Sequence, residues 1–113
     1  MNSEKFIPMK HFEVIISDKA NEDMVNIYSH IAETLLSPET AANQYDRIAD
    51  AILTLEEMPE RIKLLDSEPE HSQGIRPLIV DNYTVFYVIR NESVIVARVL
   101  YSASDISKRL SGE

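Results

Sequence analysis

The chain has 113 residues, of which 44% are hydrophobic, with 19 Asp and Glu, 11 Lys and Arg, three His and no Cys. This length supports one hydrophobic core, so a single domain over residues 1–113 is expected. The lack of Cys excludes disulfides and thiolate zinc sites and is typical of a protein in a reducing cytoplasm. No apolar run approaches the roughly 20 residues of a membrane span. Residues 1–9 carry no secretion signal and are expected to form a loose leader.

The formal net charge of −8 is divided unevenly along the chain. Residues 1–70 carry six basic and fifteen acidic side chains, whereas residues 71–113 carry five basic and four acidic ones. Because the acidic part repels polyanions, an anionic partner is expected to approach the C-terminal part.

The first half of the chain predicts a strand followed by a helical hairpin. Residues 11–17 are rich in β-branched and aromatic side chains, which favours a strand. Apolar residues then recur three and four apart over residues 18–36, as on one face of a helix. Ser37 and Pro38 predict the start of a second helix. A Ser side chain at this position accepts hydrogen bonds from backbone N–H groups of the first turn, and Pro lacks an N–H that would have no partner there. Pro59 ends this helix. The short break between the helices predicts an antiparallel hairpin.

The second half predicts a loop, three strands and a short helix. Residues 60–72 show no apolar period, and strand-like runs follow at 75–80, 83–89 and 94–101. Short breaks of turn-forming residues separate these runs, which favours an antiparallel meander. Pro77 suggests that its strand lies at an edge or carries an irregularity. Residues 105–110 predict the final helix. The order strand, helix, helix, strand, strand, strand, helix favours an α+β fold, with the hairpin on one face of an antiparallel sheet.

Several kinds of chemistry are excluded by what the sequence lacks. Two Gly are too few for a phosphate-binding loop, and no nucleotide-hydrolase or serine-hydrolase motif is present. The three histidines, His11, His30 and His71, show no metal-ligand spacing, so neither a metal nor another cofactor is expected.

Arg98 is the most informative polar residue of the predicted strands. Strict alternation would place it on one face with Val94, Val96 and Leu100. A guanidinium in an apolar strand needs a partner, because burying it unpaired is costly. One interpretation is an ion pair with Asp105, Glu13 or another acid.

The other interpretation is a small cationic spot for RNA or another anion, beside a tyrosine that could stack or transfer a proton. The weak candidates for catalysis are Arg76, Tyr87, Arg98 and Tyr101. The candidates for target binding are Arg76, Arg98 and Tyr101.

The sequence resembles the RelE/ParE toxins, including those of the plasmid-stabilisation type, over about residues 10–110. In the second half the resemblance is carried by Gly74-Ile75-Arg76, by Asn82-Tyr83-Thr84-Val85-Phe86-Tyr87, by Arg98-Val99-Leu100-Tyr101 and by Asp105-Ile106. In the first half it is carried by Ile15-Ile16-Ser17, Ala20, Ile27-Tyr28, His30-Ile31-Ala32, Pro38-Glu39-Thr40-Ala41 and Leu55-Glu56-Glu57-Met58-Pro59-Glu60-Arg61. The resemblance implies the same fold that the periodicity predicts.

The resemblance implies the toxin of a bacterial type II toxin-antitoxin module, in the cytoplasm, as a homodimer or a heterotetramer with its antitoxin. The antitoxin of this family lays a helix and an extended segment over the toxin, which would use the hairpin or a sheet edge. Because the first part of the chain is acidic, we expect the antitoxin segment that faces the hairpin to be basic.

The family divides into RelE-like toxins, which cut mRNA in the ribosome, and ParE-like toxins, which inhibit DNA gyrase. The ribonucleases carry an arginine directly after the tyrosine that matches Tyr83, where this chain has Thr84. Relatives carry basic residues before the aspartate that matches Asp105, where this chain has Ser102-Ala103-Ser104. RNA cleavage needs a base, an acid and cations around the phosphate. A ParE-like growth inhibitor is therefore favoured.

Three alternatives remain open. One is a ribosome-dependent mRNA endoribonuclease, and another is an attenuated toxin that acts only as an antitoxin-binding or co-repressor module. The third is an unrelated α+β interaction domain with a fortuitous similarity.

Overall fold

The computed structural model describes residues 11–104 and 106–111, so the leader expected over residues 1–9 lies outside the described part. The expected helices and strands are present in the expected order, which confirms the α+β fold class. They are β1 (Glu13–Ile16), α1 (Asp18–Thr34), α2 (Pro38–Leu53), β2 (Arg76–Val80), β3 (Tyr83–Arg90), β4 (Ser93–Tyr101) and α3 (Ile106–Leu110), with two single 3₁₀ turns, Thr54–Glu56 and Pro59–Arg61.

The helical hairpin begins at two serine caps. The Oγ of Ser17 accepts the backbone N–H of Ala20 at 3.1 Å, and the Oγ of Ser37 accepts that of Thr40 at 3.2 Å. The first helix ends at Thr34 rather than at Leu36, because Leu36 adopts a left-handed φ of 52° that reverses the chain.

Within residues 11–104 and 106–111, no helix is both long and apolar enough to cross a membrane.

The four strands lie in the order β1-β4-β3-β2. Strands β2, β3 and β4 form the expected antiparallel meander, and β2 is an edge strand, as Pro77 suggests. Strand β1 pairs with β4 in parallel, so the sheet is mixed rather than wholly antiparallel. Since β1 pairs only as far as Val96, the described residues supply no neighbouring strand for the second half of β4 on that side.

An irregularity in β4 changes which side chains share a face. Phe86 lies opposite Arg98 and Tyr87 lies opposite Val96, which leaves Ala97 as an extra residue. The predicted strict alternation is therefore wrong beyond Val96.

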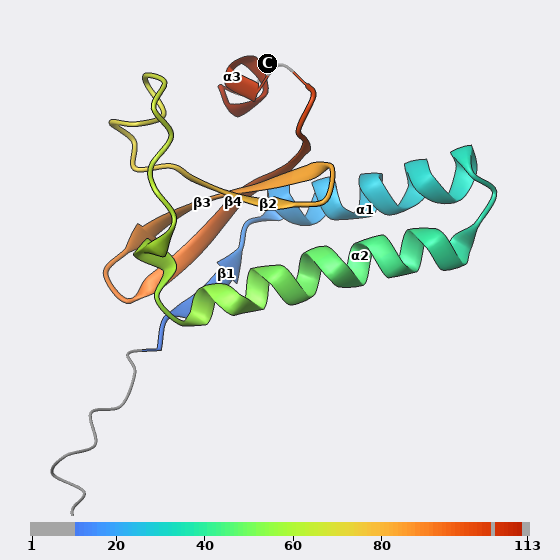
Figure 1. Ribbon diagram of the computed structural model, residues 1–113, viewed down its shortest axis with the longest axis horizontal. Helices are drawn as coiled ribbons and strands as arrows, with labels where there is room; N and C mark the ends of the chain where they lie inside the picture. The colour runs from blue at the N-terminus through green and yellow to red at the C-terminus, as the bar shows by residue number, and fades with distance from the viewer. Residues whose placement is uncertain (1–10, 105, 112–113) are drawn as a thin grey trace, which may run out of the picture.

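Two clusters of buried side chains lie on opposite faces of the sheet. The larger is formed by the hairpin and the sheet, and its members include Ala20, Met24, Ile48, Ile52, Val85, Tyr87, Val94, Val96 and Val99. The smaller consists of Ile75, Phe86 and Leu100, packed against Leu65, Val88, Ile106 and Leu110. Figure 1 shows the hairpin on one side of the sheet and α3 with the loop before β2 on the other. The face opposite the hairpin is therefore partly covered.

Asp81, in the β2–β3 turn, connects the sheet to α2. Its carboxylate accepts from Nε and Nη2 of Arg47 at 2.7 and 2.8 Å and from the amide of Gln44 at 3.1 Å. These hydrogen bonds, with that from Arg47 the largest cause, lower the pKa of Asp81 from 3.8 to about 2.

Candidate functional site

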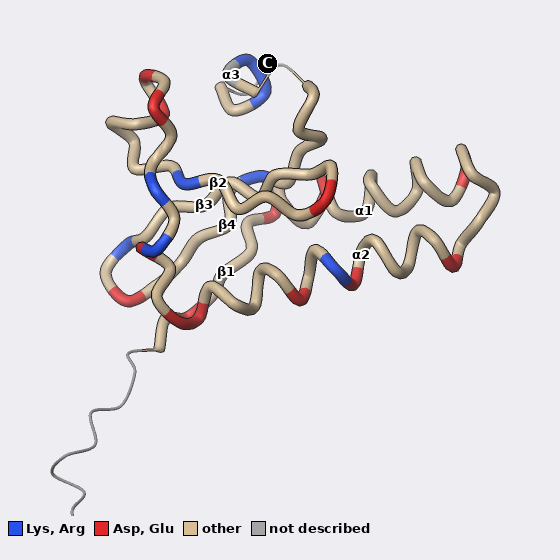
Figure 2. Tube along the Cα trace, in the orientation of Figure 1, with Lys and Arg blue, Asp and Glu red and all other residues tan. Residues whose placement is uncertain are grey.

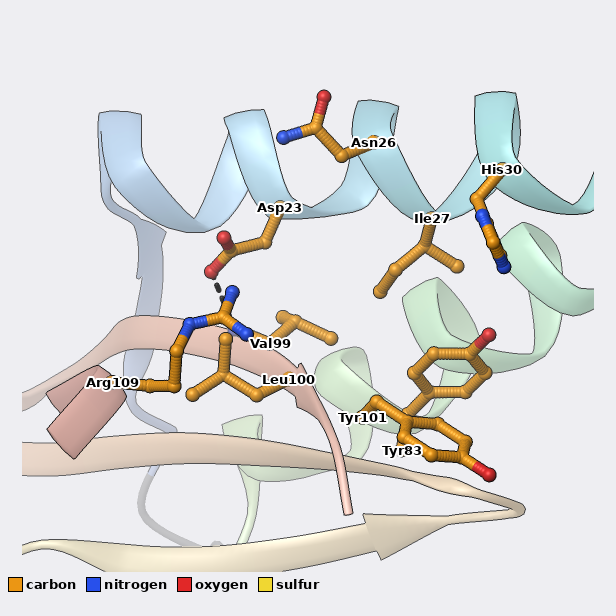
Figure 3. A pocket seen from close by; sticks show the side chains of 9 residues that line it. All are labelled: Asp23, Asn26, Ile27, His30, Tyr83, Val99, Leu100, Tyr101 and Arg109. Atoms are coloured by element: carbon orange, nitrogen blue, oxygen red, sulfur yellow. Dashed lines mark hydrogen bonds between the residues drawn. The ribbon is translucent and has the colours of Figure 1, made fainter. Parts of the chain in front are cut away.

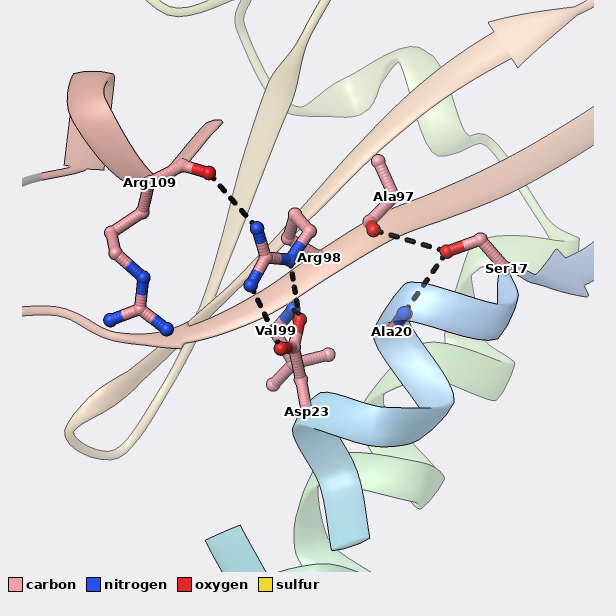
Figure 4. A network of polar contacts seen from close by, with 7 residues as sticks. All are labelled: Ser17, Ala20, Asp23, Ala97, Arg98, Val99 and Arg109. Carbon is pink, nitrogen blue, oxygen red and sulfur yellow. Dashed lines mark hydrogen bonds and ion pairs between the residues drawn. The ribbon is translucent and has the colours of Figure 1, made fainter. Parts of the chain in front are cut away.

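Arg98 forms an ion pair rather than a free cationic site (Figure 4). Its Nε and Nη2 donate to the two carboxylate oxygens of Asp23 at 2.8 and 3.0 Å, and its Nη1 donates to the carbonyl of Arg109 at 2.9 Å. The side chains of Arg98 and Asp23 are only 12% and 8% exposed. The hydrogen bond to Asp23 raises the pKa of Arg98. The interpretation as an ion pair with an acid is confirmed. Of the acids named in advance, Glu13 is not its partner and Asp105 lies outside the described residues.

The first turns of α1 take the place of the strand that β4 lacks on this side. The carboxylate of Asp23 also accepts the backbone N–H of Val99 at 2.9 Å. The hydroxyl of Ser17 donates to the carbonyl of Ala97 at 3.0 Å. Backbone groups of a strand that are buried without partners are costly, so these two side chains stabilise the open edge of β4.

Asp23 is not among the site residues predicted from the sequence, although its position in the sequence indicates that it is buried. Asp23 lies three residues after Ala20 and four before Ile27, so it occupies the apolar stripe of α1. An acid at such a position is buried and needs a cation or several donors, which Arg98 and Val99 supply here.

Arg76 and Tyr87 bind the backbone of the segment that follows α2. The Nη1 of Arg76 donates to the carbonyls of Glu60 and Ile62, and the hydroxyl of Tyr87 donates to the carbonyl of Pro59 at 2.6 Å. Tyr87 is fully buried, and this burial raises the pKa of its hydroxyl. Both side chains thus fasten residues 59–62 to the sheet.

Two of the four candidates for catalysis are tyrosines, and of these Tyr101 is the exposed one. It is 52% exposed, and its ring meets that of Tyr83 edge to face, with the ring centres 5.8 Å apart. Burial and the nearby Tyr101 hydroxyl raise the pKa of Tyr83. The two rings form a surface suited to stacking or apolar contact.

At the positions where relatives carry basic residues, this chain has hydroxyl groups that form hydrogen bonds within the protein. Thr84 is buried, and its hydroxyl shares a hydrogen bond of 2.7 Å with Ser102. The hydroxyl of Ser104 donates to the carbonyl of Tyr101 at 2.6 Å. Thr84 and Ser102 border a mostly apolar groove of about 560 Å³ on the side of the sheet that faces α3. Its lining includes Leu65, Pro77, Ile79, Phe86, Ala103 and Ile106.

The four candidates do not share one site. Arg76 and Tyr87 contact residues 59–62, Arg98 contacts α1 and α3, and Tyr101 lies at the surface beside Tyr83. Among the described residues, no three His, Asp or Glu side chains are grouped as a metal site requires. The arrangement is suited to binding more than to acid–base chemistry.

A cleft of about 550 Å³ lies between α1, the adjoining ends of β3 and β4, and α3 (Figure 3). We name it the α1–α3 cleft. Its lining consists of Asp23, Asn26, Ile27, His30, Tyr83, Val99, Leu100, Tyr101 and Arg109. Four of these residues come from α1, so the cleft depends on the first half of the chain as much as on the strands.

Acidic residues dominate the hairpin. Residues 18–53 contain seven acidic and two basic side chains. Figure 2 shows acidic residues along the hairpin, whereas basic residues gather around the start of β2 and on α3. The hairpin is therefore a mainly acidic surface, and the loop before β2 carries further acidic residues on the side of α3.

Comparison with known proteins identifies the family. The family model described as the ParE toxin of type II toxin-antitoxin system, parDE, matches residues 14–106. A search of curated proteins gives no match. Among solved structures, the fold is similar to a chromosomal ParDE toxin-antitoxin system from P. aeruginosa, with a TM-score of 0.69 and 20% identity over 81% of this chain and 97% of that chain. It is also similar to the toxin-antitoxin complex RelBE2 from Mycobacterium tuberculosis, with a TM-score of 0.57 and 22% identity over 86% of this chain and 98% of that chain. The chain belongs to the ParE toxin family of type II toxin-antitoxin systems.

Proposed function

We propose that this ParE-family toxin inhibits bacterial growth by binding DNA gyrase rather than by cutting mRNA. One observation carries the proposal: three of the four residues that could serve RNA cleavage are engaged inside the protein. Arg98 is paired with Asp23, and Arg76 and Tyr87 hydrogen-bond to backbone carbonyls.

RNA cleavage develops negative charge on the phosphate and requires proton transfer at two oxygens. The charge of Arg98 is neutralised by Asp23, and the proton of Tyr87 is donated to Pro59 in a buried site. A net charge of −8 also opposes binding to an RNA-rich ribosome. Of the residues expected to bind the target, Tyr101 is the one whose side chain is available at the surface.

The proposal includes a cytoplasmic location and a cognate antitoxin, bound to one toxin or within a heterotetramer. An antitoxin segment with basic residues suits the outer surface of the hairpin, because residues 18–53 expose six acidic side chains against two basic ones.

The test begins with induction of this chain in a bacterial culture, with and without the antitoxin encoded beside it. Purified toxin is then added to a gyrase supercoiling assay and, separately, to a translation reaction with a reporter mRNA. Tyr101→Ala is expected to weaken gyrase inhibition. Tyr45→Ala, which alters a tyrosine on α2 that is 36% exposed and lies outside the α1–α3 cleft, is the matched control.

Growth arrest that the antitoxin relieves, together with inhibited supercoiling and intact mRNA, is the expected result. Cleavage of the mRNA would overturn the proposal in favour of a ribosome-dependent endoribonuclease. A folded protein that binds the antitoxin without arresting growth would overturn it in favour of an antitoxin-binding or co-repressor module.

A further inference from the structure

The α1–α3 cleft differs in charge from the rest of the hairpin surface. We propose that it receives an acidic side chain of the antitoxin, together with an apolar side chain next to it. The proposal rests on the proposed function, because it assumes an antitoxin partner. It adds the chemistry by which one part of that partner is recognised.

The charges in the cleft favour an anion. Asp23 is the single acid among the described residues of the lining, and it is already neutralised by two hydrogen bonds from Arg98 and accepts a third from Val99. The side chain of Arg109 is exposed and forms no hydrogen bond or ion pair with the described residues, since only its backbone carbonyl is engaged. The remaining charge available to a partner in the cleft is therefore that of the Arg109 guanidinium.

Neutral groups elsewhere in the lining suit the same partner. Asn26 and His30, from successive turns of α1, line the cleft, and Figure 3 shows the ring of His30 pointing from α1 toward Tyr83 and Tyr101. An amide N–H, a ring N–H and phenolic hydroxyls can all donate to a carboxylate.

The apolar part of the lining would strengthen such a contact. The apolar groups of the lining that a partner can reach are the half-buried side chain of Ile27 and the rings of Tyr83 and Tyr101. An ion pair formed above this apolar surface is less screened by water and salt than one on an open surface. The volume of about 550 Å³ lies within the usual range for ligand sites, which is roughly 300–1,000 Å³.

The charge of the hairpin favours an antitoxin over a second copy of this chain. Two hairpins brought together would oppose six exposed acidic side chains on each copy, with two basic ones on each to offset them. We therefore expect the antitoxin segment to place basic residues over the outer surface of the hairpin and one acidic residue in the cleft.

The experiment measures the affinity of the full-length chain for the antitoxin encoded beside it, by isothermal titration calorimetry. The variants are Arg109→Glu and Arg109→Gln, and the matched control is Arg90→Glu. Arg90 is also exposed but lies at the end of β3, outside the cleft. Arg109→Glu is expected to weaken binding by about tenfold or more and Arg109→Gln by less, while Arg90→Glu changes affinity by less than about threefold. Circular dichroism is used to check that each variant is folded. If Arg109→Glu does not fold, the affinity of Arg109→Gln provides the test.

A second step identifies the acidic residue. Each Asp or Glu of the antitoxin is changed to Lys, and one of these changes is expected to restore binding to Arg109→Glu while weakening binding to the wild type. Equal effects of the Arg109 and Arg90 variants, or no restoring change, would overturn this inference and leave the proposed function standing. Failure of the wild type to bind the antitoxin would overturn both. Self-association of the wild type that Arg109→Glu abolishes would overturn the inference in favour of a second copy.

Discussion

Replacing Asp23 by Ala removes the acceptor of three hydrogen bonds at once, two from Arg98 and one from the backbone of Val99. The guanidinium of Arg98 would keep only its bond to the carbonyl of Arg109 while remaining largely buried. Breaking a buried ion pair by removing one partner costs about 3–5 kcal/mol. Because this pair lies at the edge of the sheet and Arg98 keeps one acceptor, we expect a loss near the lower limit, about 3 kcal/mol.

A loss of this size is readily measured by urea denaturation followed by circular dichroism. With an m-value of about 1.5 kcal/mol/M, the midpoint should fall by roughly 2 M. Asp23→Asn is the matched variant, since an amide oxygen can still accept from Val99, and it should lose less stability than Asp23→Ala.

A double-mutant cycle separates the ion pair from other effects. Arg98→Met removes the charge but keeps an apolar stem, so the double variant with Asp23→Ala should be less destabilised than the sum of the two single changes, by about 2 kcal/mol. Additive losses, or a loss below about 1 kcal/mol for Asp23→Ala, would refute the reasoning. An Arg98→Ala variant also loses stability, so reduced toxicity on that change must be corrected for the folded fraction.

Three further predictions concern other contacts. The pKa of Asp81, about 2 in the folded chain, lies below its unfolded value, so its contribution to stability is present above about pH 4 and is lost as the pH falls toward 2. Arg47→Ala should raise this pKa toward about 4 in an NMR titration, and an unchanged value would contradict the assignment of its cause. Tyr87→Phe should cost about 1–2 kcal/mol in urea denaturation, because a buried carbonyl loses its donor, whereas Tyr101→Phe should stay within about 0.5 kcal/mol; equal losses would argue against this difference. Leu36→Gly should leave thermal stability unchanged or raise it by up to about 1 kcal/mol, since Leu36 is 85% exposed with a positive φ, and a lower melting temperature would contradict this.

The parts of the fold that could be predicted from the sequence are those determined by residues close together in the chain. The hairpin follows from apolar residues three and four apart and from the adjacent Ser37 and Pro38, whose effects act within one helical turn. The meander follows from short turns between strands that are close in sequence. The parallel pairing of β1 with β4 has no local signal, because a strand's composition does not state the direction of its partner.

The candidate site was predicted less well, because side-chain partners come from distant segments. The need of Arg98 for an acid follows from elementary electrostatics, but the choice of Asp23 depends on how α1 lies against β4. The extra residue at Ala97 carries no glycine to mark it, so strict alternation was a natural and mistaken expectation. Asn26 and His30 of the α1–α3 cleft could not be grouped with Tyr101 until the fold was known.

Strand β4 is synthesised well after β1, and this order limits which contacts the newly synthesised toxin can form first. Ser17 and its partner Ala97 are 80 residues apart in the chain, and the sheet order of the described residues places β1 beside β4. At about 5–20 residues per second, a ribosome needs roughly 4–16 s to make that interval. During this time the hairpin can form its local contacts, whereas β1 cannot yet pair with β4, the one strand beside it in the described part of the chain. The α1–α3 cleft, which is lined by α1, β4 and α3, therefore forms only after β4 and α3 have been synthesised.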